Sequence, residues 1–194
     1  MSRTRKKGEQ VTTFSPAFMF SLFSLCLCGP SQAADVESRQ LTHYLPQDFL
    51  ETVVRKGEWV EVALDVKGGV RKGDVVRIWA GGMIDRGDGE RPGQVVNGPN
   101  GIDTVSIDRK PDLALSAERE TAYALLFKTE STIAIKCAPP GKPLEIKLTR
   151  DKEKLWVGFN DEKGHFQDNH LGKGRRHELD PLWVRVEVVR VTVD

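Results

Sequence analysis

The chain has 194 residues, of which 39% are hydrophobic and 29% are charged. This length is sufficient for one domain with a sizeable core, and the composition excludes a multi-span membrane protein and a disordered polymer. The net charge of +1 divides into +3 for residues 1–33 and −2 for the remaining 161 residues. Because the body is slightly acidic, a general nucleic-acid binder, which needs a basic face on its folded part, is excluded as well.

Residues 1–33 have the organisation of a secretory signal peptide. A basic start is followed by an apolar run over residues 14–28, a Gly29-Pro30 break and the small residues Ser31 and Ala33. The apolar run is shorter than the stretch of about 20 residues that a membrane span needs. We therefore predict cleavage after Ala33, export to the periplasm or the exterior, and a mature chain without a membrane span. An uncleaved anchor and a lipoprotein are the alternatives.

Residues 34–57 are mostly polar and are interpreted as a lead-in segment with a short helix around residues 47–54. From residue 58 onward, runs rich in β-branched and aromatic residues alternate with turn clusters, which is typical of strands. Several of these runs alternate polar and apolar residues, as expected when one face is buried and the other is in water. The expected strands lie at residues 59–64, 75–80, 123–128, 132–137, 144–148, 155–159 and 182–193. The pattern predicts an all-β protein, a jelly-roll-like β-sandwich of about seven or eight strands, with one domain over residues 58–194.

The sequence lacks two motifs that mark common hydrolases. It has neither a G-x-S-x-G elbow nor an H-E-x-x-H pair, and its many carboxylates show no spacing that marks a glycosidase. The mature chain would keep a single cysteine, Cys137, which cannot form an intramolecular disulfide and has no base beside it. We interpret Cys137 as a buried structural thiol and expect no enzyme, with a glycan-active hydrolase as the alternative.

The loop that follows the expected strand at residues 155–159 has the most distinctive side chains. It places Asp161, Asp168 and Asn169 within nine residues, around Gly164. Ca²⁺ prefers six to eight oxygen ligands from carboxylates, amides and carbonyls. The spacing differs from that of an EF-hand, and a solvated turn would explain it too. A zinc site with the loop's histidines is a further alternative, although their spacing fits no zinc motif. These histidines are His165, His170 and His177.

Three stretches of the chain resemble one known family. In the first, residues 72–82, a strand begins with Gly73-Asp74. The second, residues 86–101, contains Arg86-Gly87 and ends on Gly98-Pro99-Asn100-Gly101. The third, residues 160–169, begins with Asn160-Asp161 and ends with Asp168-Asn169. In these stretches, and in a closing strand at residues 182–186, the chain resembles the calcium-dependent galactophilic lectins of the PA-I type, which are small bacterial β-sandwiches.

The resemblance implies a calcium site and a sugar site that share ligands. Asp161, Asp168 and Asn169 would bind Ca²⁺ through their side chains, and Arg86 and His165 through their backbone carbonyls. Sugar hydroxyls would take the last two positions on the metal. Asp168 stands where the family has Asn, and the extra negative charge should strengthen calcium binding.

The same resemblance implies that Lys110 and Asp112 line the sugar site together with Asp161 and Asp168. Lys110 and Leu113 stand where the family has His and Gln, so a galactose-like sugar and an anionic glycan are both open as ligands. The basic residues within 173–176 are compatible with an anionic sugar. A homo-oligomer would gain avidity from several such sites. The alternative function is a non-catalytic envelope or partner-binding module that has kept the fold and lost the sugar site.

Overall fold

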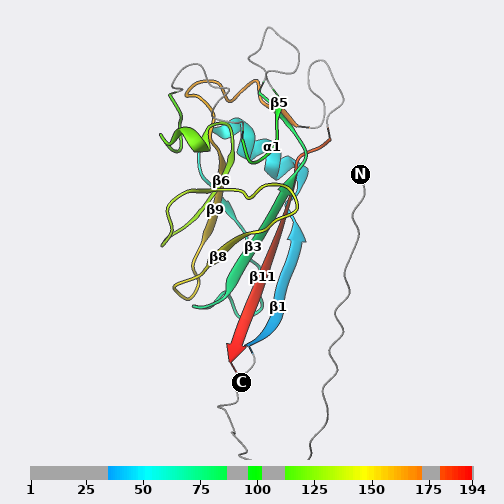
Figure 1. The fold of residues 1–194 in the computed structure, drawn as a ribbon, viewed down its shortest axis with the longest axis vertical. Coiled ribbons are helices and arrows are strands. Elements are labelled where there is room, and N and C mark those ends of the chain that lie inside the picture. Colours follow the sequence, from blue (N-terminus) through cyan, green and yellow to red (C-terminus); the bar gives the residue numbers. More distant parts are fainter. Residues whose placement is uncertain (1–34, 87–95, 102–111, 172–179, 194) are drawn as a thin grey trace, which may run out of the picture. The chain divides into compact units, whose positions relative to one another are not determined.

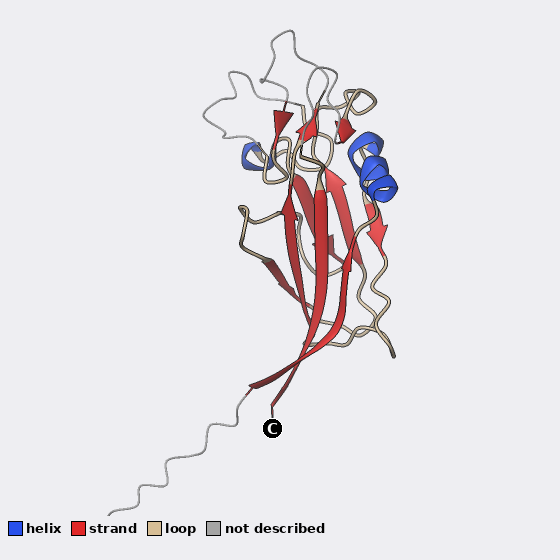
Figure 2. Ribbon diagram, turned by 90° about the vertical axis from the view of Figure 1, so that its right-hand side faces the viewer, coloured by secondary structure: helices blue, strands red, loops and turns tan. Residues whose placement is uncertain are grey.

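The computed structural model describes residues 35–86, 96–101, 112–171 and 180–193. The chain divides into the units Met1–Gln32 and Ala33–Asp194, and all described elements belong to the second unit. The predicted signal peptide, Lys110, His177 and the basic segment 173–176 lie outside the described residues. The described part consists of antiparallel sheets with one α-helix, α1 (Gln47–Lys56), and a short 3-10 turn at Arg119–Thr121 (Figures 1 and 2).

The first sheet has four strands in the order β1-β11-β3-β8. Its members are β1 (Asp35–Tyr44), β11 (Trp183–Val193), β3 (Val75–Gly81) and β8 (Leu144–Lys147). Figure 1 shows β1, β11 and β3 side by side along most of their length. An ion pair fixes the end of this sheet, because Arg190 on β11 holds the buried Asp74, at the start of β3, through two contacts of 2.8 Å. The Gly73-Asp74 pair of the sequence motif therefore has a structural role.

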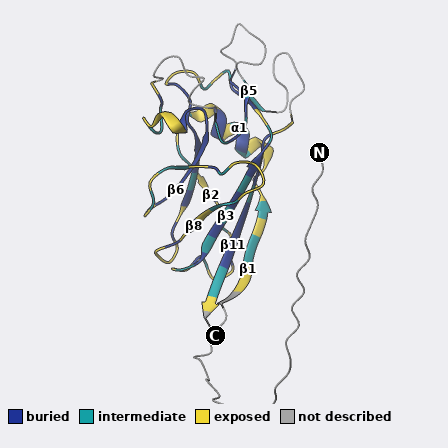
Figure 3. Ribbon diagram, in the orientation of Figure 1, coloured by how far each residue is buried: buried dark blue, intermediate teal, exposed yellow. Residues whose placement is uncertain are grey.

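The second sheet has the order β2-β9-β6-β7. Its members are β2 (Val60–Val62), β9 (Leu155–Phe159), β6 (Leu125–Thr129) and β7 (Ile135–Lys136). The two sheets share one hydrophobic core, to which both contribute buried residues, drawn dark blue in Figure 3. The core includes Val76, Ile78, Val184, Val186, Val188, Leu125, Phe127, Leu155, Val157 and Phe159. The predicted β-sandwich is therefore confirmed.

A third, small sheet has the order β10-β4-β5, with β10 (His170–Leu171), β4 (Ile84–Asp85) and β5 (Val96–Asn97). Together with α1 it lies at one end of the two larger sheets (Figure 2). Helix α1 has an amphipathic pattern, with Leu50, Val53 and Val54 buried on one face, and ends at Gly57 in the left-handed conformation that favours glycine. No helix among the described residues is long and apolar enough to cross a membrane.

All seven predicted strands are present, although their ends shift by a few residues. The described residues form eleven strands, more than the seven or eight expected, because β1 and the two-residue strands β4, β5 and β10 had no clear signal. The structure also differs from the expected lead-in at residues 34–57. This segment supplies the edge strand β1, which pairs along β11, and the predicted helix extends to Lys56 and contributes to the core.

The single cysteine of the predicted mature chain behaves as a structural group. Cys137 is 1% exposed, has a free thiol and packs in the hydrophobic core. Burial raises the pKa of this thiol to about 12, which keeps it protonated at neutral pH.

Candidate functional site

The predicted metal loop begins directly after β9 and returns to the small sheet at β10. It brings Asp161 and Asn169 into contact, since Asn169 Nδ2 donates to Asp161 Oδ2 at 3.0 Å. Both residues are at most 1% exposed. Asp161 Oδ1 accepts the N–H of Glu162 at 2.7 Å. Both oxygens of Asp161 therefore accept a hydrogen bond within the loop.

Two oxygen atoms of this loop are buried and lack a hydrogen-bond partner among the residues that the structure describes. They are Oδ1 of Asp168 and Oδ1 of Asn169. The amide of Asn169 is oriented by its Nδ2, which donates to Asp161 and, at 2.8 Å, to the carbonyl of Val54. An acceptor left buried and unsatisfied costs about 1–3 kcal/mol. Amide and carboxylate oxygens of this kind, together with the Asp161 carboxylate that the Asn169 amide contacts, are the donors that a hard cation such as Ca²⁺ requires.

Arg86 reaches this loop through the pairing of β4 with β10, in which Asp85 lies opposite His170. Continued by one residue, this register sets the backbone of Arg86 beside Asn169. The structure therefore places Arg86 at the loop, although its sequence distance from Asn169 exceeds 80 residues.

Sequence reasoning missed two buried residues beside Asp161. The Tyr123 hydroxyl donates a short hydrogen bond to Glu162 Oε1, and the guanidinium of Arg86 lies 3.8 Å from the centre of the Tyr123 ring. Burial raises the pKa of Tyr123, and the bond to Glu162 raises it further, whereas the charge of Arg86 lowers it. Tyr123 also has a φ of 55°, a backbone conformation that is strained for a residue with a side chain. Only the tertiary structure gathers this cluster, so no sequence signal could have found it.

The segment around Asp112, predicted to line the sugar site, runs beside the metal loop. Leu113 forms a bridge with Glu162, and the N–H of Lys163 donates to the carbonyl of Asp112 at 2.9 Å. The Asp112 carboxylate is exposed and pairs with Lys163 Nζ at 2.8 Å. Leu113 is instead part of the hydrophobic core. Asp112 and Lys163 thus form a polar rim next to Asp161, and Leu113 does not contribute to it.

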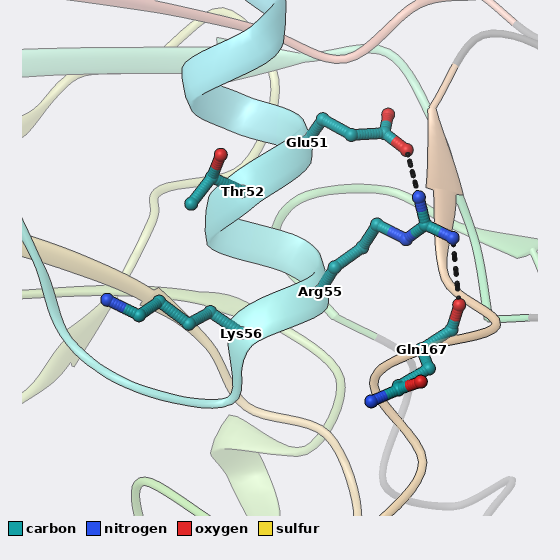
Figure 4. Close-up of a pocket in the computed structure, with 5 residues that line it drawn as sticks. All are labelled: Glu51, Thr52, Arg55, Lys56 and Gln167. Atoms are coloured by element: carbon teal, nitrogen blue, oxygen red, sulfur yellow. Dashed lines mark hydrogen bonds and ion pairs between the residues drawn. The ribbon is translucent and has the colours of Figure 1, made fainter.

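Helix α1 holds the other side of the loop. The carbonyl of Val54 accepts a hydrogen bond from Asn169 Nδ2. Arg55 Nη2 donates to the carbonyl of Gln167 at 3.0 Å, and Arg55 Nη1 contacts Glu51 at 3.3 Å (Figure 4). A Cβ atom on Gly57 would lie 2.5 Å from the ring of Phe166, so the loop approaches the helix end as closely as glycine permits. The segment expected to be a lead-in therefore positions the candidate metal loop.

Asn160, the first residue of the loop motif, is a structural anchor. Its side chain is fully buried and accepts the N–H groups of Leu115 and Ser116 at 2.9 and 3.1 Å. The two hydrogens of its Nδ2 are shared among three acceptors, the carbonyls of Ser116 and Thr121 at 3.0 and 3.1 Å and the Thr121 hydroxyl at 2.9 Å. Asn160 therefore ties the start of the metal loop to residues 115–121.

The histidines of the loop do not gather in the described structure. His165 is exposed in a turn, where its N–H donates to the carbonyl of Glu162 at 3.1 Å, and His170 is part of β10. Within the described residues no group of three His, Cys, Asp or Glu side chains is placed to hold a metal. The described contact in the loop instead joins the Asp161 carboxylate to the Asn169 amide.

No protein-family model and no curated protein matches the chain. Among solved structures, the chain is similar to the EclA N-terminal domain, described as a PllA-like lectin. The TM-score is 0.35 and the sequence identity is 15%, over 70% of this chain and 94% of that chain.

Proposed function

We propose that the protein is a calcium-dependent, non-catalytic carbohydrate-binding protein. Asp161, Asp168 and Asn169 bind the metal through side-chain oxygens, and Arg86 and His165 through backbone carbonyls. The observation that carries the proposal is the buried Oδ1 of Asn169, whose amide contacts the Asp161 carboxylate, together with the buried Oδ1 of the preceding residue, Asp168. Neither oxygen has a hydrogen-bond partner among the described residues. When bound, Ca²⁺ supplies coordination positions for two sugar hydroxyls.

The protein's own groups orient the sugar around that metal. Asp112, beside the loop, and Lys163, within it, form an exposed acceptor and donor pair. Both side chains can exchange hydrogen bonds with hydroxyl groups. Lys110, one residue before Pro111-Asp112 in the sequence, is proposed to be a further donor. The ligand is a galactose-like sugar or an anionic glycan, and the protein acts after export through the signal peptide at residues 1–33.

Calcium binding is tested by titration calorimetry on protein freed of metal with EDTA. Asp168→Ala removes a charged ligand that is only partly buried, so the variant should fold and bind Ca²⁺ about tenfold more weakly or worse. Asp161→Asn should have at least the same effect. At a concentration 100 times its Kd, Ca²⁺ should stabilise the wild-type protein by about 2.7 kcal/mol.

The matched control is Asp151→Asn, an exposed carboxylate that accepts the N–H of Lys72 at 2.9 Å near the start of β9, whereas the metal loop follows the end of β9. This variant should bind calcium as the wild type does. If Asp168→Ala and Asp161→Asn also kept wild-type affinity, the assignment of the metal site would be wrong.

A glycan array probed with and without chelator tests the sugar. Hits that disappear with EDTA support the lectin. If no neutral or acidic sugar on the array binds the protein, the second candidate is favoured, a partner-binding module without a sugar site. That candidate is supported by the burial of Leu113 where the resemblance implies a polar contact. Turnover of a chromogenic glycoside or ester panel would contradict the non-catalytic part of the proposal.

A further inference from the structure

We infer that the protein has a second ligand site, separate from the proposed calcium site, that binds a small organic cation with a hydrocarbon body. The site is a crevice of about 500 Å³ between β1, the first turn of α1 and the segment that begins with β2. This volume lies within the range of about 300–1,000 Å³ that is typical of small-molecule sites.

The position of the crevice follows from the sheet order. β1 is an end strand of the first sheet and β2 is an end strand of the second. Among the described residues, no further strand closes the sandwich between β1 and β2. Apolar side chains are therefore accessible to a ligand at this place. The interior is formed by Leu41 and Leu45 from β1 and its exit, Phe49 from α1 and Ala63 after β2. This surface suits the apolar part of a ligand.

The polar groups of the crevice are mostly acidic. Asp48, Glu61 and Asp65 line it, and of these Glu61 is paired with Lys154 Nζ at 2.8 Å. Asp48 and Asp65 have no ion pair or side-chain hydrogen bond within the described part of the chain. Two unneutralised carboxylates beside an apolar surface favour a cation and repel an anion.

One further acceptor lies inside the crevice. His43 is directly opposite Val186 in the pairing of β1 with β11, so its ring is on the inner, Val186 side of the sheet. Its Nδ1 is buried and has no hydrogen-bond partner among the described residues. With the ring proton on Nε2, Nδ1 accepts a hydrogen bond from an ammonium group. The crevice thus offers carboxylates, a ring nitrogen and hydrocarbon, which together match an alkylammonium ion.

The probe is hexylammonium, with hexanol and hexanoate as neutral and anionic compounds of the same length. In a ¹H–¹⁵N NMR titration of the full domain, hexylammonium should shift the amide signals of residues 41–45 and 63–65. Hexanol should bind about tenfold more weakly, and hexanoate should not bind, because two carboxylates together contribute on the order of 1.4 kcal/mol to the recognition of a cation. Binding should be equal in EDTA and in calcium, since the proposed metal site is separate.

The double variant Asp48→Asn, Asp65→Asn changes two exposed side chains and should retain the fold. It should lose about tenfold in affinity for hexylammonium while its affinity for hexanol stays the same. Glu51→Gln is the matched control, because Glu51 lies one turn further along α1, points toward Arg55 and is outside the crevice (Figure 4). Ala63→Phe should fill the crevice and abolish binding of both compounds. Equal binding of hexanol and hexylammonium, or an unchanged affinity in the double variant, would overturn the inference, as would the absence of any shift at millimolar hexylammonium.

Discussion

Replacing Glu153 with alanine should lower the free energy of unfolding by about 3 kcal/mol, one of the two largest effects expected in this protein. Glu153 is 2% exposed and lies just before β9. Its carboxylate accepts hydrogen bonds from the Thr129 hydroxyl at 2.6 Å and from both the hydroxyl and the N–H of Ser131. It also accepts hydrogen bonds from the N–H groups of Thr149 and Arg150 at 2.7 and 3.1 Å. One side chain therefore joins the turn after β6 to the turn before β9, and alanine would leave several donors without a partner.

The same carboxylate should make stability depend on pH. Burial alone raises the pKa of Glu153, but the hydrogen bonds from Ser131, Thr129, Thr149 and Arg150 outweigh it and lower the pKa from 4.5 to about 2. Because the folded state holds this proton less tightly than the unfolded state, the stabilisation is complete above pH 4.5 and is lost as the pH falls toward 2. This difference between the pKa values of Glu153 in the unfolded and folded states corresponds to about 3 kcal/mol of folding stability.

Urea unfolding at several pH values, with Glu153→Gln as the comparison, isolates this contribution from those of the other carboxylates. The stability difference between wild type and Glu153→Gln should be constant from pH 7 to 5 and should shrink between pH 4.5 and 2. A difference that stayed constant down to pH 2 would show that the charge of Glu153 contributes nothing.

Asn160→Ala should reduce both the stability of the protein and its affinity for calcium. The side chain has five hydrogen-bond contacts inside the protein, three of them shared by the two hydrogens of Nδ2, so its removal should cost about 3 kcal/mol. Asp161 is the next residue in the chain, and its position depends on how Asn160 anchors the start of the loop. Metal ligands displaced in this way bind about 10- to 100-fold more weakly.

Glu153→Ala is the control for Asn160→Ala, because the two residues lie just beyond opposite ends of β9. Both variants should unfold at a lower urea concentration, and calorimetry below that concentration should show weaker calcium binding only for Asn160→Ala. Equal calcium affinities in the two variants would mean that Asn160 contributes to stability alone and does not position Asp161.

The strands of the core were predictable because their signal is local. The segments that became β3, β9 and β11 contain the β-branched and aromatic runs that mark buried strands, and the structure places them in the two main sheets. β1 was not predictable in this way. As an edge strand it pairs only with β11, and its sequence is largely polar, so its pattern does not differ from that of a polar segment outside the domain.

The candidate site was predictable only in part, for the same reason. Asp161, Asp168 and Asn169 are close in sequence, and a short loop keeps such residues close in space. The resemblance added Arg86 and Asp112, whose positions depend on the pairing of β4 with β10 and on the bridge between Leu113 and Glu162. Tyr123 and Glu162 had no signal at all, because a buried hydrogen bond between residues 39 apart leaves no local pattern.

The sequence by itself determined the class of fold, the buried character of Cys137 and a loop rich in oxygen ligands, because each depends on residue type and on spacing within a few positions. Only the tertiary structure decided that Asn160 is an anchor, that α1 holds the metal loop and that Leu113 is buried in the core. The acidic crevice likewise exists only because the fold brings residues of the edge strands β1 and β2 to opposite sides of one opening. These features arise from contacts between residues far apart in the chain, and such contacts form only when the sheets pack.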